Sequence, residues 1–113
     1  MNQNPKVYIV QEPMKSDGKG GLRPMMDFTP ALVYGELEVL IESSRPLLTP
    51  APLIHELKRK LKDFGSDDFL LAVGDPGLIA VATMVASKIN HGRVNLLKWD
   101  RESRSYLKLS YEV

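Results

Sequence analysis

The turn Gly74-Asp75-Pro76-Gly77 is the first place where this sequence could bind a ligand. It joins an apolar run to a helix that is expected to begin at Pro76. Ligands of open α/β sheets bind beyond the carboxyl ends of the strands, and a helix N-terminus offers free N–H groups to a phosphate or carboxylate. Gly74, Asp75 and Gly77 are therefore candidate ligand-binding residues. The turn lacks G-x-G-x-x-G and the Lys-Ser/Thr of a Walker loop, and we favour a helix-capping role for Asp75.

A basic cluster near the end of the first expected helix is a second candidate. Lys58, Arg59 and Lys62, with Lys60 among them, could contact nucleic acid. These side chains spread over much of the polar circumference, and the helix dipole favours cations there. The nearby aromatic ring, Phe64, belongs to the apolar side of the helix and offers no stacking platform. We therefore favour a solvated helix face over a nucleic-acid contact.

Two groups of residues could bind a protein partner. Met25 and Met26 lie in a Gly-rich segment and would form an adaptable apolar surface. Trp99, with Arg101 and Arg104 close behind it, has the residue types that dominate interface hot spots. A place for Trp99 inside the core is an equal alternative.

The sequence offers no evident catalytic or metal-binding set. It has no cysteine, which excludes disulfides, thiolate metal sites and cysteine nucleophiles. His55 and His91 are far apart in sequence and have no triad-like partners. The row of glutamates at positions 36, 38 and 42 is more typical of the solvent-exposed face of a strand than of a cation-binding site. We expect no catalytic residue, no metal and no cofactor.

Length and composition indicate a single globular domain over residues 1–113. The apolar fraction is 43% and the charged fraction 26%, as in ordinary globular proteins. The formal net charge of +1 predicts no bulk attraction to nucleic acid. The N-terminus does not read as a signal peptide, and the longest mostly apolar run, 78–89, is too short to span a bilayer. We expect a cytoplasmic protein without membrane contact.

The hydrophobic pattern predicts an α/β fold, at the boundary of α+β, with a small mixed sheet of about five strands and two helices. A central βαβαβ unit should place strands 37–41, 69–73 and 94–97 in one parallel sheet. Another strand is expected at 6–11, and a C-terminal antiparallel hairpin at 93–113. Residues 14–27 are expected to form a flexible Gly/Met-rich loop, because no periodicity survives there.

Local signals set further expectations for the helices and the second strand. Thr49 should cap the first helix, Pro50 should occupy its first position, and Gly65 should end it in a left-handed conformation. The strand at 37–41 should bury Leu37, Val39 and Ile41 and turn its other, mostly acidic side to water. The second helix is apolar nearly all round, so its own domain or a partner must bury more than one of its sides.

Three segments carry a resemblance to a known group of proteins. They are Pro30-Ala31-Leu32-Val33-Tyr34-Gly35-Glu36-Leu37, Asp68-Phe69-Leu70-Leu71-Ala72-Val73-Gly74-Asp75-Pro76 and Gly92-Arg93-Val94-Asn95-Leu96-Leu97-Lys98-Trp99-Asp100-Arg101. Across about three-quarters of its length, from Phe28 onward, the chain resembles small proteins of unassigned activity encoded in tailed-bacteriophage genomes. The resemblance implies a viral source and a host-cytoplasmic setting.

The sequence thus favours a non-enzymatic phage accessory protein that binds another protein, with a second copy of itself (a homodimer) among the candidates. One alternative is a small α/β domain that binds a phosphate-bearing ligand at residues 74–77. The other is nucleic-acid binding through the basic helix face 58–62.

Overall fold

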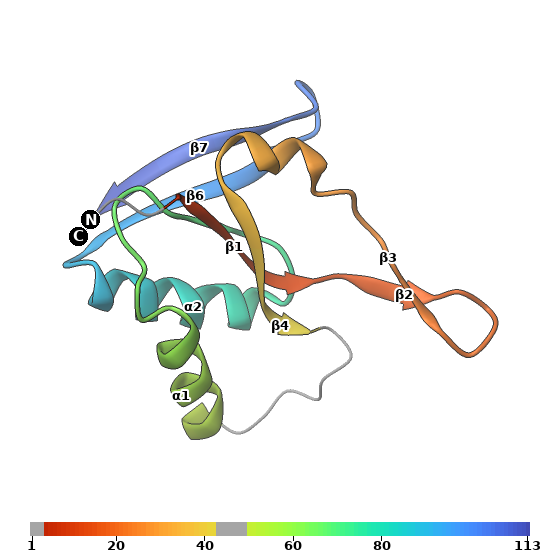
Figure 1. Cartoon of the computed structure of the whole chain (residues 1–113), viewed down its shortest axis with the longest axis horizontal. Helices are drawn as coiled ribbons and strands as arrows, with labels where there is room; N and C mark the ends of the chain where they lie inside the picture. The colour runs from red at the N-terminus through yellow and green to blue at the C-terminus, as the bar shows by residue number, and fades with distance from the viewer. Residues whose placement is uncertain (1–3, 43–49) are drawn as a thin grey trace.

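The computed structural model describes residues 4–42 and 50–113. Within these ranges it contains seven strands, two α-helices and one 3₁₀ helix (Figure 1): β1 (Lys6–Glu12), β2 (Met14–Ser16), β3 (Leu22–Pro24), η1 (Thr29–Val33), β4 (Glu36–Glu42), α1 (Pro50–Lys60), β5 (Phe69–Leu71), α2 (Pro76–Ile89), β6 (Arg93–Asp100) and β7 (Ser105–Glu112).

The main sheet has the strand order β4-β1-β5-β6-β7. β1 pairs in parallel with β4 and β5, β5 pairs in parallel with β6, and β6 pairs antiparallel with β7. The predicted α/β class, the five-stranded mixed sheet, the parallel central strands and the C-terminal hairpin are confirmed. The N-terminal strand β1 lies between β4 and β5, a position that local sequence patterns do not reveal.

The sheet is covered on both faces (Figure 1). α1 and α2 cover one face, which we call the helix side, and their core cluster includes Leu57, Leu61 and Leu78. η1 and Phe28 cover the other face, where the cluster includes Tyr106. β5 contributes to both clusters and is buried throughout, as its continuous apolar run predicts.

The first helix ends differently from the expectation. Gly65 does not adopt a left-handed conformation, so the predicted left-handed cap is wrong. The helix ends at Lys60 and the chain continues through a turn, after which the Gly65 N–H donates to the Asp68 carboxylate at 2.8 Å. The Asp68 carboxylate thus takes the N–H that a left-handed cap would direct back to a helix carbonyl. The turn after the helix is instead closed by the Phe64 N–H, which donates to the Leu61 carbonyl at 2.8 Å. The predicted cap residue Thr49 lies outside the described residues.

The faces of β4 also depart from the simple alternation. Leu40, expected on the wet side, is fully buried in the helix-side core, whereas Leu37 and Val39 are only partly buried. The Nζ of Lys60 in α1 donates to the Leu40 carbonyl oxygen. β4 is an edge strand, and α1 covers its C-terminal end. Which side chains of β4 are buried therefore depends on where α1 lies as well as on the alternation along the strand.

Residues 14–24 form a projecting two-stranded ribbon where the sequence predicted a loop (Figure 1). β2 and β3 pair antiparallel, and the Asp17 carboxylate closes their turn by accepting from the N–H groups of Lys19 and Gly21. Most side chains of the ribbon are exposed, so it carries no apolar alternation that the sequence could reveal. The flexibility of this segment stays a prediction.

Candidate functional site

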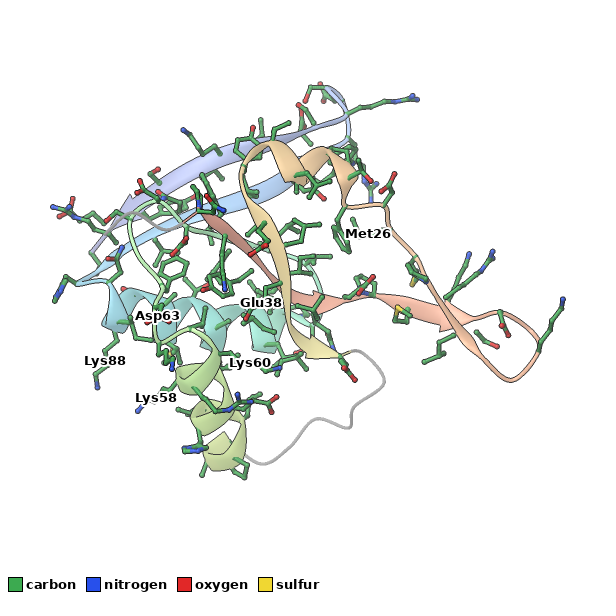
Figure 2. The ribbon with its side chains drawn as sticks, viewed as in Figure 1. Met26, Glu38, Lys58, Lys60, Asp63 and Lys88 are labelled. Atoms are coloured by element: carbon green, nitrogen blue, oxygen red, sulfur yellow. The ribbon has the colours of Figure 1, made fainter. Side chains whose placement is uncertain are left out.

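An apolar groove lies between α1 and α2 on the outer surface of the helix layer. Its volume is about 380 Å³, and it is lined by Ile54, Lys58, Val81, Met84, Val85, Lys88 and Ile89. Figure 2 shows Lys58 on α1 and Lys88 on α2 extending from neighbouring positions. Apart from these two lysines, every lining side chain is hydrophobic.

The groove follows from the composition of α2. The inner side of this helix buries residues at helical spacing against the sheet, namely Leu78, Ala82, Val85 and Ala86. Val81, Met84 and Ile89 border the groove on the side of α1, and Met84 is 66% exposed. Because α2 is apolar nearly all round, the sequence predicted that it would be buried on more than one side. The rest of the domain buries only part of its apolar surface.

The positive charges of the groove come from its two lysines. Neither Lys58 nor Lys88 has an ion pair or hydrogen bond with another residue in the described part of the chain. Lys60, by contrast, is held by Glu56 at 3.2 Å and by the Leu40 carbonyl. The groove therefore combines an apolar lining with two available positive charges.

The predicted nucleic-acid residues do not all face this groove. Lys58 lines it, whereas Arg59 and Lys62 are exposed and are not among its lining residues. Nucleic-acid binding by Lys58, Arg59 and Lys62 stays a prediction.

A second pocket lies on the opposite face of the sheet and joins two of the predicted partner-binding groups. Met26 and Trp99 line it together with Asp27, Pro30 and Tyr106, and its volume is about 350 Å³. Both Met26 and Trp99 are partly buried and pack against that face's core cluster. The rings of Trp99 and Tyr106 meet edge to face with centroids 5.0 Å apart.

Trp99 therefore lies between the two positions that the sequence offered, and its role in binding a partner stays a prediction. It belongs to the edge of the core and also lines a surface pocket. Met25, Arg101 and Arg104 are exposed and are not among the lining residues. At the pocket's rim, the hydroxyl and N–H of Thr29 donate to Asp27 and lower the pKa of its carboxyl group.

The Gly74–Gly77 turn has the predicted strand-to-helix position and the predicted cap. The Asp75 carboxylate accepts from the Leu78 N–H at 3.1 Å, and Pro76 begins α2. The Asp75 N–H donates to the side-chain oxygen of Gln11 at 2.9 Å. Asp75 thus has a structural role, while ligand binding at Gly74, Asp75 and Gly77 stays a prediction.

The remaining candidates do not assemble into a catalytic or metal-binding group. Among the described residues, no three His, Cys, Asp or Glu side chains are grouped so that they could hold a metal ion. Glu38 accepts a hydrogen bond from Lys6 at 3.0 Å, and this contact raises the pKa of the lysine. His55 and His91 are exposed.

Sequence reasoning missed the groove itself, although part of its signal was present. The excess of apolar residues on α2 indicated an additional interface. Its position depends on how α1 crosses α2, which is a tertiary relationship. In the described part of the chain, neither α-helix is long and apolar enough to cross a membrane.

The mixed sheet, its two-helix layer and the uncovered groove define a small α/β protein with an apolar surface between its helices. Residues 5–113 match the family described as phage Pam3 gp32-like protein. The chain belongs to this family, and the phage resemblance seen in the sequence is confirmed. Searches of the curated proteins and of the solved structures found no match.

Proposed function

We propose that this phage protein acts in the host cytoplasm as a non-enzymatic binding protein, and that the α1–α2 groove receives an amphipathic helix of a partner protein. The partner helix would insert apolar side chains between Ile54 and Met84 and place acidic side chains beside Lys58 and Lys88. The single observation that carries the proposal is an apolar groove bordered by two lysines without partners in the described structure.

The apolar lining supports an amphipathic helix as the occupant. Grooves between helices are a recurrent site for such helices, which insert side chains at i, i+3, i+4 and i+7 spacing. Methionine adapts to differently shaped partners, and Met84 is a large apolar side chain of α2 that is 66% exposed. A partner that covers Met84 would complete the burial that the composition of this helix requires.

The charges of the groove support acidic residues on the partner. Lys58 and Lys88 carry the positive charge of the lining, and no acidic residue belongs to it. A carboxylate on each flank of the partner helix would pair with these lysines at the rim. Such rim charges mainly add specificity and speed association, whereas the apolar contacts supply most of the affinity.

The alternative functions have weaker support. At the 74–77 turn, Asp75 places a carboxylate where a phosphate would bind and uses that carboxylate as a helix cap. In the basic cluster, Lys58 borders aliphatic side chains and no aromatic residue lines the groove, whereas single-stranded nucleic acids are held by aromatic stacking.

The proposal is tested with two labelled helical peptides that share one apolar stripe and carry either glutamate or lysine on both flanks. Fluorescence anisotropy should show that the glutamate peptide binds the wild-type protein and that the lysine peptide binds at least about tenfold more weakly. Met84→Glu should weaken binding of the glutamate peptide by about tenfold or more.

Met25→Glu is the matched control, because Met25 is also exposed but lies away from the groove. It should leave the affinity unchanged. Equal binding of the two peptides, or equal effects of the two substitutions, would overturn the proposal.

A further inference from the structure

The main sheet has two edge strands. β4 forms one edge, and the side chain of Lys60 in α1 bonds its Leu40 carbonyl. β7 forms the other edge (Figure 1) and, within the described residues, pairs with β6 alone. Unprotected edge strands present unpaired N–H and C=O groups that can pair with another chain.

The free backbone groups of β7 can be assigned from its register. The N–H of Val113 donates to the Gly92 carbonyl at 2.8 Å, and antiparallel pairs alternate between bonded and non-bonded positions. The backbones of Tyr106, Lys108, Ser110 and Glu112 therefore point away from β6. The Tyr106 carbonyl accepts from the Tyr34 hydroxyl at 3.5 Å. The open stretch consequently runs from Lys108 to Glu112.

An apolar stripe runs along the same edge. Leu107, Leu109 and Tyr111 lie opposite Lys98, Leu96 and Val94 of β6, and they share the helix side of the sheet with these residues. α2 packs over β1 and β6, so this part of β7 is incompletely covered. Leu107 is 41% exposed and Tyr111 53% exposed. With respect to residues 4–42 and 50–113, β7 thus presents free hydrogen-bonding groups and uncovered apolar side chains together.

We propose that β7 pairs antiparallel with β7 of a second copy of this chain, with the two-fold axis at Ser110, to form one continuous ten-stranded sheet. This register pairs Ser110 with itself and Lys108 with Glu112 of the other copy, twice by symmetry. It also places Leu109 opposite Tyr111 on the helix side. The proposal is independent of the α1–α2 groove, because no residue of β7 lines that groove.

Charge complementarity selects this register. A two-fold axis at Lys108 would set two lysines directly opposite each other, which destabilises strand pairing. An axis at Leu109 would place Glu112 opposite Tyr106, whose carbonyl is already bonded to Tyr34. The axis at Ser110 uses only the open stretch and matches opposite charges at both of its ends. The Glu112 carboxylate, which the Arg93 Nε contacts at 3.3 Å, would then lie between Arg93 of its own chain and Lys108 of the other copy.

The absence of cysteine from the chain allows a direct test. In the proposed dimer the two Ser110 Cα atoms form a bonded antiparallel pair, with a separation of about 5.5 Å that suits a disulfide. Ser110→Cys should therefore give a covalent dimer under mild oxidation. Lys108→Cys alone should not cross-link, because the two copies of residue 108 lie four residues apart along the paired strands. The double variant Lys108→Cys/Glu112→Cys should cross-link, because residue 108 of one copy lies opposite residue 112 of the other.

A charge reversal tests the same register without cysteine. Lys108→Glu should raise the dimer dissociation constant, measured by sedimentation, by about tenfold or more, because two attractive pairs become repulsive. Adding Glu112→Lys should restore the dimer. Lys108 is exposed, so circular dichroism should show that the Lys108→Glu variant remains folded.

A monomer at all concentrations without a Ser110→Cys cross-link would overturn the proposal. A dimer that cross-links through Lys108→Cys instead would overturn the register. Association of β7 with only a strand of a different protein would likewise contradict self-pairing.

Discussion

The side-chain oxygen of Gln11 accepts a hydrogen bond of 2.9 Å from the backbone N–H of Asp75, and this contact joins the end of β1 to the start of α2. The Gln11 N–H also donates to the Val73 carbonyl at 3.2 Å. Gly74 lies between these contacts with φ of +110°, and a Cβ built on it would stand 2.5 Å from the Cβ of Gln11. The close approach of these two segments therefore requires glycine at position 74.

Gly74→Ala should lower the free energy of unfolding by about 2 kcal/mol or more, because it combines an unfavourable backbone conformation with a steric clash. Urea denaturation measures the change. Gly65→Ala is the matched control, since Gly65 is not left-handed and its nearest neighbouring atom would be 3.9 Å from a new Cβ. Equal effects of the two substitutions would contradict the assigned role of Gly74.

Asp75→Ala should lower the free energy of unfolding by about 1 kcal/mol, because it removes the cap of α2. Asp75→Asn should retain most of the stability, since asparagine caps helices about as well as aspartate. Thermal unfolding of both variants at neutral pH measures the difference. A loss with Asp75→Asn as large as that with Asp75→Ala would show that the negative charge matters more than the hydrogen bond to Leu78.

Tyr106 should make the protein less stable in alkali. Burial raises the pKa of its hydroxyl above the ordinary value of 10.0, and the nearby Asp27 carboxylate acts in the same direction. The unfolded chain then loses this proton at a lower pH than the folded chain, so the free energy of unfolding falls as the pH rises above about 10.

Tyr106→Phe should make that fall less steep in urea midpoints measured across this pH range. It should not abolish the fall, because burial also raises the pKa of Tyr8. The wild-type protein, measured over the same pH range, is the reference. A Tyr106→Phe variant with the wild-type slope would contradict this account.

Trp99→Ala should lower the free energy of unfolding by about 2–3 kcal/mol, because the ring packs against the core and meets Tyr106 edge to face. Arg101→Ala should change it by less than about 0.5 kcal/mol, since Arg101 is exposed. Chemical denaturation compares the two. Equal stability of wild type and Trp99→Ala would mean that Trp99 contributes only to the surface pocket.

The elements that could be predicted from the sequence are those with local signals. β6 and β7 follow from apolar patterns separated by a polar turn, and α2 from the cap at Asp75 and the proline after it. The β2–β3 ribbon is held by backbone hydrogen bonds and the Asp17 turn, which leave no apolar pattern. The burial of Leu40 depends on α1 and could not be seen in β4 alone.

The candidate sites were predictable only in part, for the same reason. Met26 and Trp99 were recognised separately by residue type, but their common pocket exists because η1 and the β6–β7 hairpin meet on one face of the sheet. The α1–α2 groove likewise needs the packing of two helices. Residue types indicate which side chains favour protein interfaces, whereas only the tertiary structure shows which of them remain exposed to solvent.

The most direct test of the binding proposal is to map the contact surface by NMR, titrating the isotope-labelled protein with the glutamate-flanked amphipathic peptide. We expect the largest amide and methyl shifts at Ile54, Lys58 and residues 81–89, with saturation at one peptide per chain. Absence of shifts, or shifts centred on Trp99 or on residues 74–77, would contradict the assignment of the α1–α2 groove as the binding site.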